Sequence, residues 1–149
     1  MTFAIDVNLL LYASDETSPM HVRAREALTR AIAGPSICYM FWPTAMAYLR
    51  IATHPSIFSQ PLSIDDAAAN IEMILSRPHV QTVGESDRFW PRFRGVMDDA
   101  RPTGNLIPDA QIVSLMLENG IREIWTSDRD YRRFEGIAAT DPIARDDSN

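Results

Sequence analysis

Residues 104–136, GNLIPDAQIVSLMLENGIREIWTSDRDYRRFEG, contain the signals for half of a parallel α/β unit. Pro108-Asp109 stands where the first turn of a helix is expected, and apolar residues recur at helical spacing as far as Asn119-Gly120, a typical C-terminal cap. A short β-type run at 121–126 follows, and an acidic loop, residues 127–130, comes directly after it. The stretch therefore predicts a helix, a strand and an acidic loop, in that order.

Acidic residues from three segments are expected to meet at one edge of the sheet. In a parallel α/β unit the helix runs antiparallel to its strands, so its N-terminus lies at the strands' carboxyl ends, where such sheets bind ligands. Asp109 should therefore lie near Asp128 and Asp130. Asp6 ends the first apolar run of the chain and is directed to the same edge. The sequence thus predicts one site containing four carboxylates.

The rest of the chain alternates between strand and helix patterns. Helical patterns begin near residues 7, 19, 42, 64, 86–90 and 108, and strand patterns cover 2–5, 37–41, 79–83, 121–126 and 137–139. This alternation predicts an α/β fold: a three-layer α/β/α sandwich around a central, mostly parallel sheet of four to five strands. We expect a single domain over residues 1–139, followed by an acidic C-terminal tail at 140–149.

Composition narrows the class of protein. A chain of 149 residues fits one domain, and no run of 18 apolar residues is present, so no membrane span is expected. The single cysteine, Cys38, excludes an internal disulfide and fits a reducing, cytoplasmic location. The net charge of −6 argues against a general nucleic-acid-binding surface, and every basic residue is arginine.

Clustered carboxylates need a counter-charge. At a separation of about 5 Å two of them repel by roughly 3 kcal/mol at an effective dielectric near 20. Hard oxygen ligands favour Mg²⁺ or Mn²⁺, which can activate water or stabilise a leaving oxygen of a phosphodiester. Each acid also has a simpler explanation: Asp109 is stabilised by the helix dipole, and Asp128 and Asp130 suit loop and cap positions. Asp6 at the end of an apolar strand is the hardest to explain structurally.

Several short motifs, taken together and in this order, resemble the PIN-domain ribonucleases. They are Asp6-Val7-Asn8-Leu9-Leu10, the Trp42-Pro43 helix with Leu49-Arg50-Ile51-Ala52-Thr53-His54-Pro55, Pro108-Asp109-Ala110, and Thr126-Ser127-Asp128-Arg129-Asp130-Tyr131. The match is best with the VapC toxins of type II toxin–antitoxin modules, in the branch abundant in mycobacteria. The resemblance implies Mg²⁺- or Mn²⁺-dependent cleavage of RNA (often tRNA or a ribosomal RNA loop), inhibition by a cognate VapB-type antitoxin, and homodimerisation.

The resemblance also assigns roles to individual residues. It implies that Asp6, Asp109, Asp128 and Asp130 form the catalytic acidic pocket, with Asp6, Asp109 and Asp128 as metal ligands. Asn8 and Thr126 would support that pocket. Four arginines are candidates for RNA contacts: Arg50, Arg129, Arg132 and Arg133. Their alternative role is a solvated helix face.

One residue departs from the family pattern. Many PIN domains carry a glutamate three residues before the arginine of the third helix, and that position is Ala47 here. This departure leaves open whether the site binds one metal ion or two. It also motivates an alternative in which a catalytically weak PIN fold only binds antitoxin or RNA. A second alternative is a metal-dependent phosphatase, because Asp6-Val7-Asn8 is similar to the Asp-x-Asp of such enzymes. The second acid of that motif and the usual phosphate-binding lysine are both missing.

Overall fold

Five parallel strands form one sheet in the computed structural model, which describes residues 1–144. They are β1 (Thr2–Ile5), β2 (Ile37–Tyr39), β3 (Val80–Gln81), β4 (Glu123–Trp125) and β5 (Ala138–Thr140), arranged in the order β3-β2-β1-β4-β5. Every neighbouring pair is parallel. The predicted parallel sheet is confirmed, including the fifth strand at its edge.

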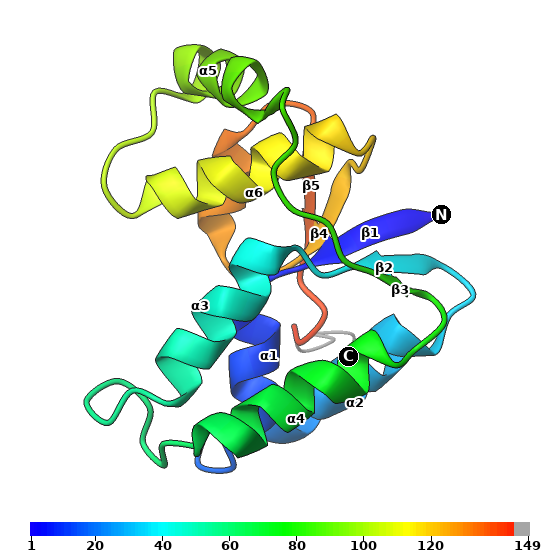
Figure 1. Cartoon of the computed structure of the whole chain (residues 1–149), viewed down its shortest axis with the longest axis vertical. Coiled ribbons are helices and arrows are strands. Elements are labelled where there is room, and N and C mark those ends of the chain that lie inside the picture. Colours follow the sequence, from blue (N-terminus) through cyan, green and yellow to red (C-terminus); the bar gives the residue numbers. More distant parts are fainter. Residues whose placement is uncertain (145–149) are drawn as a thin grey trace, which may run out of the picture.

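Helices cover both faces of this sheet (Figure 1). They are α1 (Val7–Ser14), α2 (His21–Ala33), α3 (Trp42–Ala52), α4 (Ile64–Leu75), α5 (Phe89–Ala100) and α6 (Leu106–Glu118), with a 3-10 helix η1 (Arg129–Arg133) after β4. Helices α1 to α4 pack in one apolar cluster, and α5, α6 and η1 pack in the other. The three-layer α/β/α sandwich is therefore confirmed. Within residues 1–144, none of the helices combines the length and the hydrophobicity that crossing a membrane requires.

The central strand shows why both faces are covered. Successive side chains of a strand point to opposite faces, so Phe3 and Ile5 pack with α1 to α4, while Ala4 packs with α5 and α6. All three side chains are buried. Phe3 also stacks on Trp125 of β4, with ring centroids 4.3 Å apart. A strand whose buried residues are all apolar is typical of a parallel sheet with helices on both sides.

Two helices begin slightly earlier than their prolines suggest. Helix α6 begins at Leu106, so Pro108 is its third residue, and α5 begins at Phe89, so Pro91 is likewise its third residue. Proline is tolerated there because the first N–H groups of a helix have no partner within the helix. The strands at 79–83 and 121–126 are shorter than predicted, with two and three residues.

The C-terminal segment is folded beyond residue 139. Thr140 ends β5, and Ile143 packs into the cluster of α1 to α4. The guanidinium of Arg23 on α2 donates a hydrogen bond to the carbonyl oxygen of Ile143 at 2.9 Å. The folded part thus extends past the expected boundary, while residues 145–149 of the expected tail lie outside the described residues.

The strand order places a crevice between β1 and β4. The chain leaves β1 toward β2 on one side of the sheet, whereas β4 and β5 lie on the other. At such a reversal the segments that follow the two strands diverge, and open α/β sheets bind ligands there. Asp6 directly follows β1, and Thr126 to Asp128 follow β4.

Candidate functional site

Asp6 is a buried carboxylate held by three hydrogen bonds. It is only 6% exposed and caps the N-terminus of α1. Its oxygens accept from the Val7 amide at 2.8 Å, from the Asn8 side-chain amide at 3.3 Å and from the Thr126 hydroxyl at 2.7 Å. Burial nevertheless raises the pKa of Asp6 above its ordinary value, with a smaller contribution from the charge of Asp128. Asn8 and Thr126 therefore contact the acid that they were expected to support.

Thr126 connects the ends of the two central strands. Its hydroxyl donates to Asp6 and accepts a hydrogen bond from the amide of Asp128 at 2.9 Å. Asp128 in turn caps η1, because its carboxylate accepts from the amide of Asp130 at 2.9 Å. These short-range bonds fix the backbone of the loop after β4 and orient the Asp128 carboxylate.

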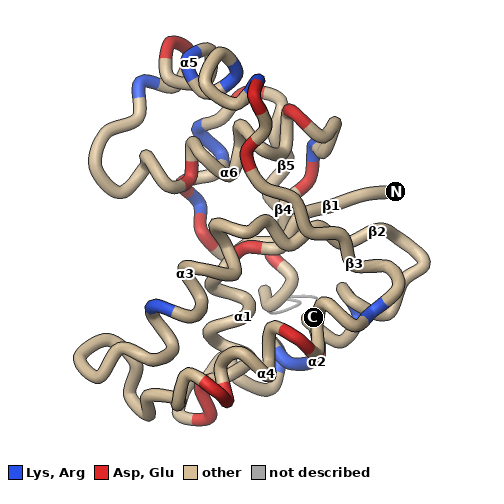
Figure 2. Tube along the Cα trace, in the orientation of Figure 1, with Lys and Arg blue, Asp and Glu red and all other residues tan. Residues whose placement is uncertain are grey.

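Three carboxylates converge from α6 and this loop. Oxygen atoms of Asp109, Asp128 and Asp130 lie within 4.8 Å of one another. In Figure 2 the acidic positions gather where α3 and α6 approach the segment after β4. Pairs at this separation repel by roughly 3 kcal/mol at an effective dielectric near 20, and by less for the solvent-exposed Asp130. The group is a destabilising one unless protons or a cation neutralise it.

The pKa of Asp109 reports this crowding. It rises from 3.8 to about 7, first because the side chain is partly desolvated and then because Asp128 and Asp6 carry like charges. A hydrogen bond with the Tyr131 side chain opposes the rise. Tyr131 is 1% exposed and is a member of the site that the sequence did not reveal. Its spacing of three residues from the buried Phe134 was the available signal.

The structure brings together all four predicted acids, but the three that lie closest together are not the three that were expected to bind the metal ion. The tightest group is Asp109, Asp128 and Asp130, and Asp6 is not one of its members. Asp6 lies beside them, since its charge raises the pKa of both Asp109 and Tyr131. An all-oxygen donor set of this kind fits Mg²⁺ or Mn²⁺ and suits softer metals poorly.

A cleft of about 370 Å³ opens beside Asp6 and Asp109. Its other walls are largely apolar, and the uncharged residues that form them are Val7, Pro43, Thr44, Met46, Ala47, Pro108, Gln111, Ile112 and Tyr131. Ala47, at the position where many PIN domains carry a glutamate, lines this cleft. Arg50 also lines the cleft and is exposed, whereas Arg129, Arg132 and Arg133 are exposed on η1 outside its lining.

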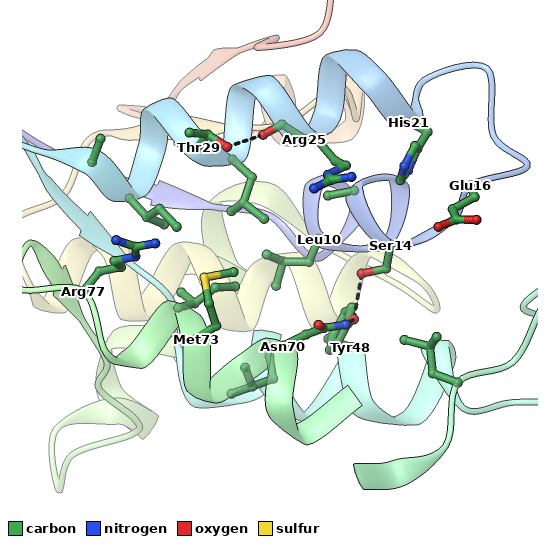
Figure 3. Close-up of a pocket in the computed structure, with 17 residues that line it drawn as sticks. Leu10, Ser14, Glu16, His21, Arg25, Thr29, Tyr48, Asn70, Met73 and Arg77 are labelled. Atoms are coloured by element: carbon green, nitrogen blue, oxygen red, sulfur yellow. Dashed lines mark hydrogen bonds between the residues drawn. The ribbon is translucent and has the colours of Figure 1, made fainter. Parts of the chain in front are cut away.

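A second hollow, of about 430 Å³, lies among α1 to α4 and is called the helical groove below (Figure 3). Its walls include Leu10, Leu28, Ile71 and Ile74. A polar network around the buried Tyr48 closes one side: the Tyr48 hydroxyl hydrogen-bonds with the Ser14 hydroxyl at 2.7 Å and accepts from the Asn70 side-chain amide at 2.9 Å. Arg25, Arg77, His21 and Glu16 also line the groove.

Sequence comparison connects this geometry with known proteins. Residues 3–137 match the PIN domain family. The chain is 46% identical over 144 residues to Ribonuclease VapC48 of Mycobacterium tuberculosis, an alignment covering 97% of this chain and 99% of the relative. It is 32% identical over 138 residues to Ribonuclease VapC33 of the same species, covering 93% and 96% of the two chains.

Solved structures show the same fold at low sequence identity. VapC20 of Mycobacterium tuberculosis, described as a sarcin-ricin loop cleaving toxin, has a TM-score of 0.64 at 13% identity, with 87% of this chain and 92% of that chain covered. VapBC2 of Rickettsia felis, bound to a DNA fragment from its promoter, has a TM-score of 0.65 at 14% identity, with 94% and 98% covered.

Proposed function

The chain belongs to the PIN-domain family, and from this premise we propose that it is a metal-dependent endoribonuclease of the VapC type, the toxin of a toxin–antitoxin pair. The observation that carries the proposal is the convergence of Asp109, Asp128 and Asp130 beside Asp6 at the switch point of a parallel sheet. Two relatives over nearly the whole chain are named ribonucleases, which supports the same activity.

Nucleases of this family generally use a divalent metal ion, and the acidic group suits Mg²⁺ or Mn²⁺. We propose Asp109 and Asp128 as ligands, with Asp130 and Asp6 completing the pocket. When bound, such an ion supplies Lewis acidity toward a phosphate and lowers the pKa of its water. The chain's own part is to hold the acids in place: Thr126 and Asn8 orient Asp6, and Tyr131 contacts Asp109.

The proposed substrate is a structured RNA, such as a tRNA or a ribosomal RNA loop, which also implies a cytoplasmic location. The sarcin-ricin loop cleavage described for VapC20 supports this class of target. The exposed arginines of η1 (Arg129, Arg132 and Arg133) stand next to the acidic loop and are candidates to bind phosphates on either side of the cleavage site.

Incubation of the purified protein with total RNA in Mn²⁺, followed by sequencing of the new ends, tests the proposal. We expect cleavage at a few positions, and its disappearance when a chelator removes the ion. RNA that is bound but never cut would favour the binding-only alternative that Ala47 suggests. Release of phosphate from a small phosphomonoester without RNA cleavage would favour the phosphatase.

We place the antitoxin on the helical groove. A groove with apolar walls between helices fits an amphipathic helix of a partner, and the exposed Met73 in its lining offers further apolar area. A basic extension of that partner would complement the acidic cleft and compete with the metal ion, since the chain carries a net charge of −6.

We further propose that two copies of the chain associate through α3. Trp42 and Met46 lie one turn apart on this helix and are 43% and 52% exposed. Neighbouring exposed apolar side chains of this size are typical of an interface. Sedimentation analysis of the Met46→Glu variant tests the idea: the proposed dimer should dissociate, and an unchanged mass would exclude this face.

A further inference from the structure

Helix α3 presents two residues of contrasting character to the acidic cleft. Ala47 and Arg50 are three residues apart, so they lie on the same face of the helix, and both line the cleft together with Asp6 and Asp109. Ala47 contributes no charge where many PIN domains place a carboxylate. Arg50 contributes a cation to a cleft whose other charged lining residues are these two acids.

The guanidinium of Arg50 forms no ion pair within residues 1–144, where Arg94–Asp98 is the single salt bridge. Its own helix explains part of this, because α3, WPTAMAYLRIA, contains no acidic residue. A glutamate at position 47 would lie within reach of Arg50 along the helix, and alanine removes that partner. Arg50 is therefore free to bind a ligand that enters the cleft.

A phosphodiester would satisfy both halves of this cleft. An arginine binds two phosphate oxygens with parallel hydrogen bonds, and the apolar side chains of Val7 and Ile112 reduce the water that competes for those bonds. The carboxylates of the site would hold a divalent cation, which would supply further positive charge toward the same phosphate. The cleft thus offers a guanidinium and two carboxylates that do not pair with each other.

We infer that Arg50 is a further catalytic residue, whose guanidinium binds the scissile phosphate in the space that Ala47 leaves uncharged. The inference rests on the proposed nuclease function. In hydrolysis a water oxygen bonds to phosphorus, one bridging P–O bond breaks, and the departing sugar oxygen gains the proton that the water loses. Negative charge grows on the non-bridging oxygens during this step, and Arg50 stabilises it. The role is the one that a second metal ion would take in a two-metal site.

Three substitutions test the role of Arg50: Arg50→Ala, Arg50→Lys and, as a matched control, Arg122→Ala. Arg122 is exposed next to the start of β4, at the opposite edge of the sheet from the acids. We expect single-turnover cleavage in Mn²⁺ to fall about a hundredfold in Arg50→Ala, which is typical for loss of one charge-stabilising donor. Arg50→Lys should recover only part of the rate, because lysine lacks the two-pronged geometry. Arg122→Ala should cleave as the wild type does.

Two further measurements separate a catalytic from a structural role. Titration calorimetry with Mn²⁺ alone should show affinity in Arg50→Ala that is equal to or tighter than in the wild type, because a nearby cation is removed. Millimolar guanidinium chloride should restore part of the lost rate to Arg50→Ala and leave Arg122→Ala unchanged. Cleavage within twofold of the wild type, or a loss of Mn²⁺ binding in Arg50→Ala, would overturn the inference.

Measurement of RNA binding by fluorescence anisotropy in Ca²⁺ tests this inference separately from the proposed nuclease function. If the wild type cleaves no RNA under any condition, the nuclease proposal fails. If Arg50→Ala and Arg122→Ala then also bind RNA with equal affinity, the proposed contact between Arg50 and a phosphate is wrong as well. If Arg50→Ala alone binds RNA at least threefold more weakly than the wild type, the phosphate contact is supported even though the nuclease function is not.

Discussion

The acidic cleft and the helical groove are of similar size, about 370 and 430 Å³, but their polar groups are arranged in opposite ways. In the groove, the buried hydroxyl of Tyr48 has hydrogen-bond partners in Ser14 and Asn70, so this hydroxyl is satisfied without any ligand. In the cleft, Asp109 and its acidic neighbours repel one another, and the pKa of Asp109 is raised to about 7. The network at Tyr48 therefore needs no ligand, whereas a cation or protons would relieve the repulsion at Asp109.

This difference predicts what each region contributes. Replacing an acid in a site of unneutralised charge should reduce activity and at the same time raise stability, because repulsion is relieved. This trade-off is common at functional sites. Substitutions at an exposed apolar contact change affinity for a partner and leave the fold and the chemistry alone. The predictions below test that separation.

The largest effect is expected from the acids. Asp109→Asn should lower RNA cleavage at least a hundredfold, because it removes a metal ligand and a negative charge. It should also raise the melting temperature of the metal-free protein, since one repelling charge is gone. Asp6→Asn should abolish cleavage to the same extent without that gain in stability. Asp6 accepts three hydrogen bonds through its two carboxylate oxygens. The amide of asparagine has only one acceptor oxygen, so at least one of these bonds is lost. Cleavage assays and thermal unfolding check both variants, and full activity in either would remove that acid from the proposed site.

The groove should respond in the opposite way. Met73 on α4 lines the groove and is 42% exposed, so Met73→Asp should leave folding and RNA cleavage unchanged. It should weaken inhibition by the proposed antitoxin roughly tenfold or more, because a charge replaces an apolar contact that the complex would desolvate. Ile64→Asp is the matched control: it lies on the same helix, is 59% exposed and is outside the groove lining. Equal inhibition of the two variants would show that the antitoxin binds elsewhere.

The two regions also differ in how far the sequence predicted them. Asp6, Asp109, Asp128 and Asp130 were placed at one edge because strand ends and helix starts coincide there in any parallel α/β unit. Tyr131 was missed because Arg129, Asp130, Arg132 and Arg133 around it suggest an exposed helix, and only the packing of η1 buries it. The groove could not be predicted from periodicity, since its walls come from helices whose relative positions are set by tertiary packing.

Ala47 gives a prediction of intermediate size. The wild type should bind one Mg²⁺ or Mn²⁺ weakly without RNA, and any second ion should require a substrate phosphate as a ligand. Because Ala47 lines the same cleft as Asp6 and Asp109, Ala47→Glu should tighten metal binding, up to about tenfold for one added carboxylate ligand. Pairing of the new carboxylate with Arg50 limits the gain. Titration calorimetry decides the question, and two tight sites in the wild type would contradict the one-ion assignment.

The smallest effect is the pH dependence of stability in the cleft. The pKa of Asp109 is about 7 in the folded protein and near 3.8 ordinarily, so the folded state binds this proton more tightly than the unfolded chain does. The free energy of unfolding of the metal-free protein should therefore decrease as pH rises from about 4 to about 7, and level off above. Because Asp109 is only half-buried, screening should reduce this loss to about 1–2 kcal/mol. Asp6, whose pKa is also raised, contributes in the same direction.

Thermal unfolding at pH 5 and pH 8, with and without Mg²⁺, measures this effect. Asp109→Asn should lose most of the decrease, because the amide does not titrate. Saturating Mg²⁺ at pH 8 should restore stability to the wild type and do little for the variant, since the ion neutralises the charge that the proton neutralises at lower pH. The same pH dependence in Asp109→Asn as in the wild type would assign the effect to other groups. It would then follow that Asp109, Asp128 and Asp130 repel one another less than separations of at most 4.8 Å imply.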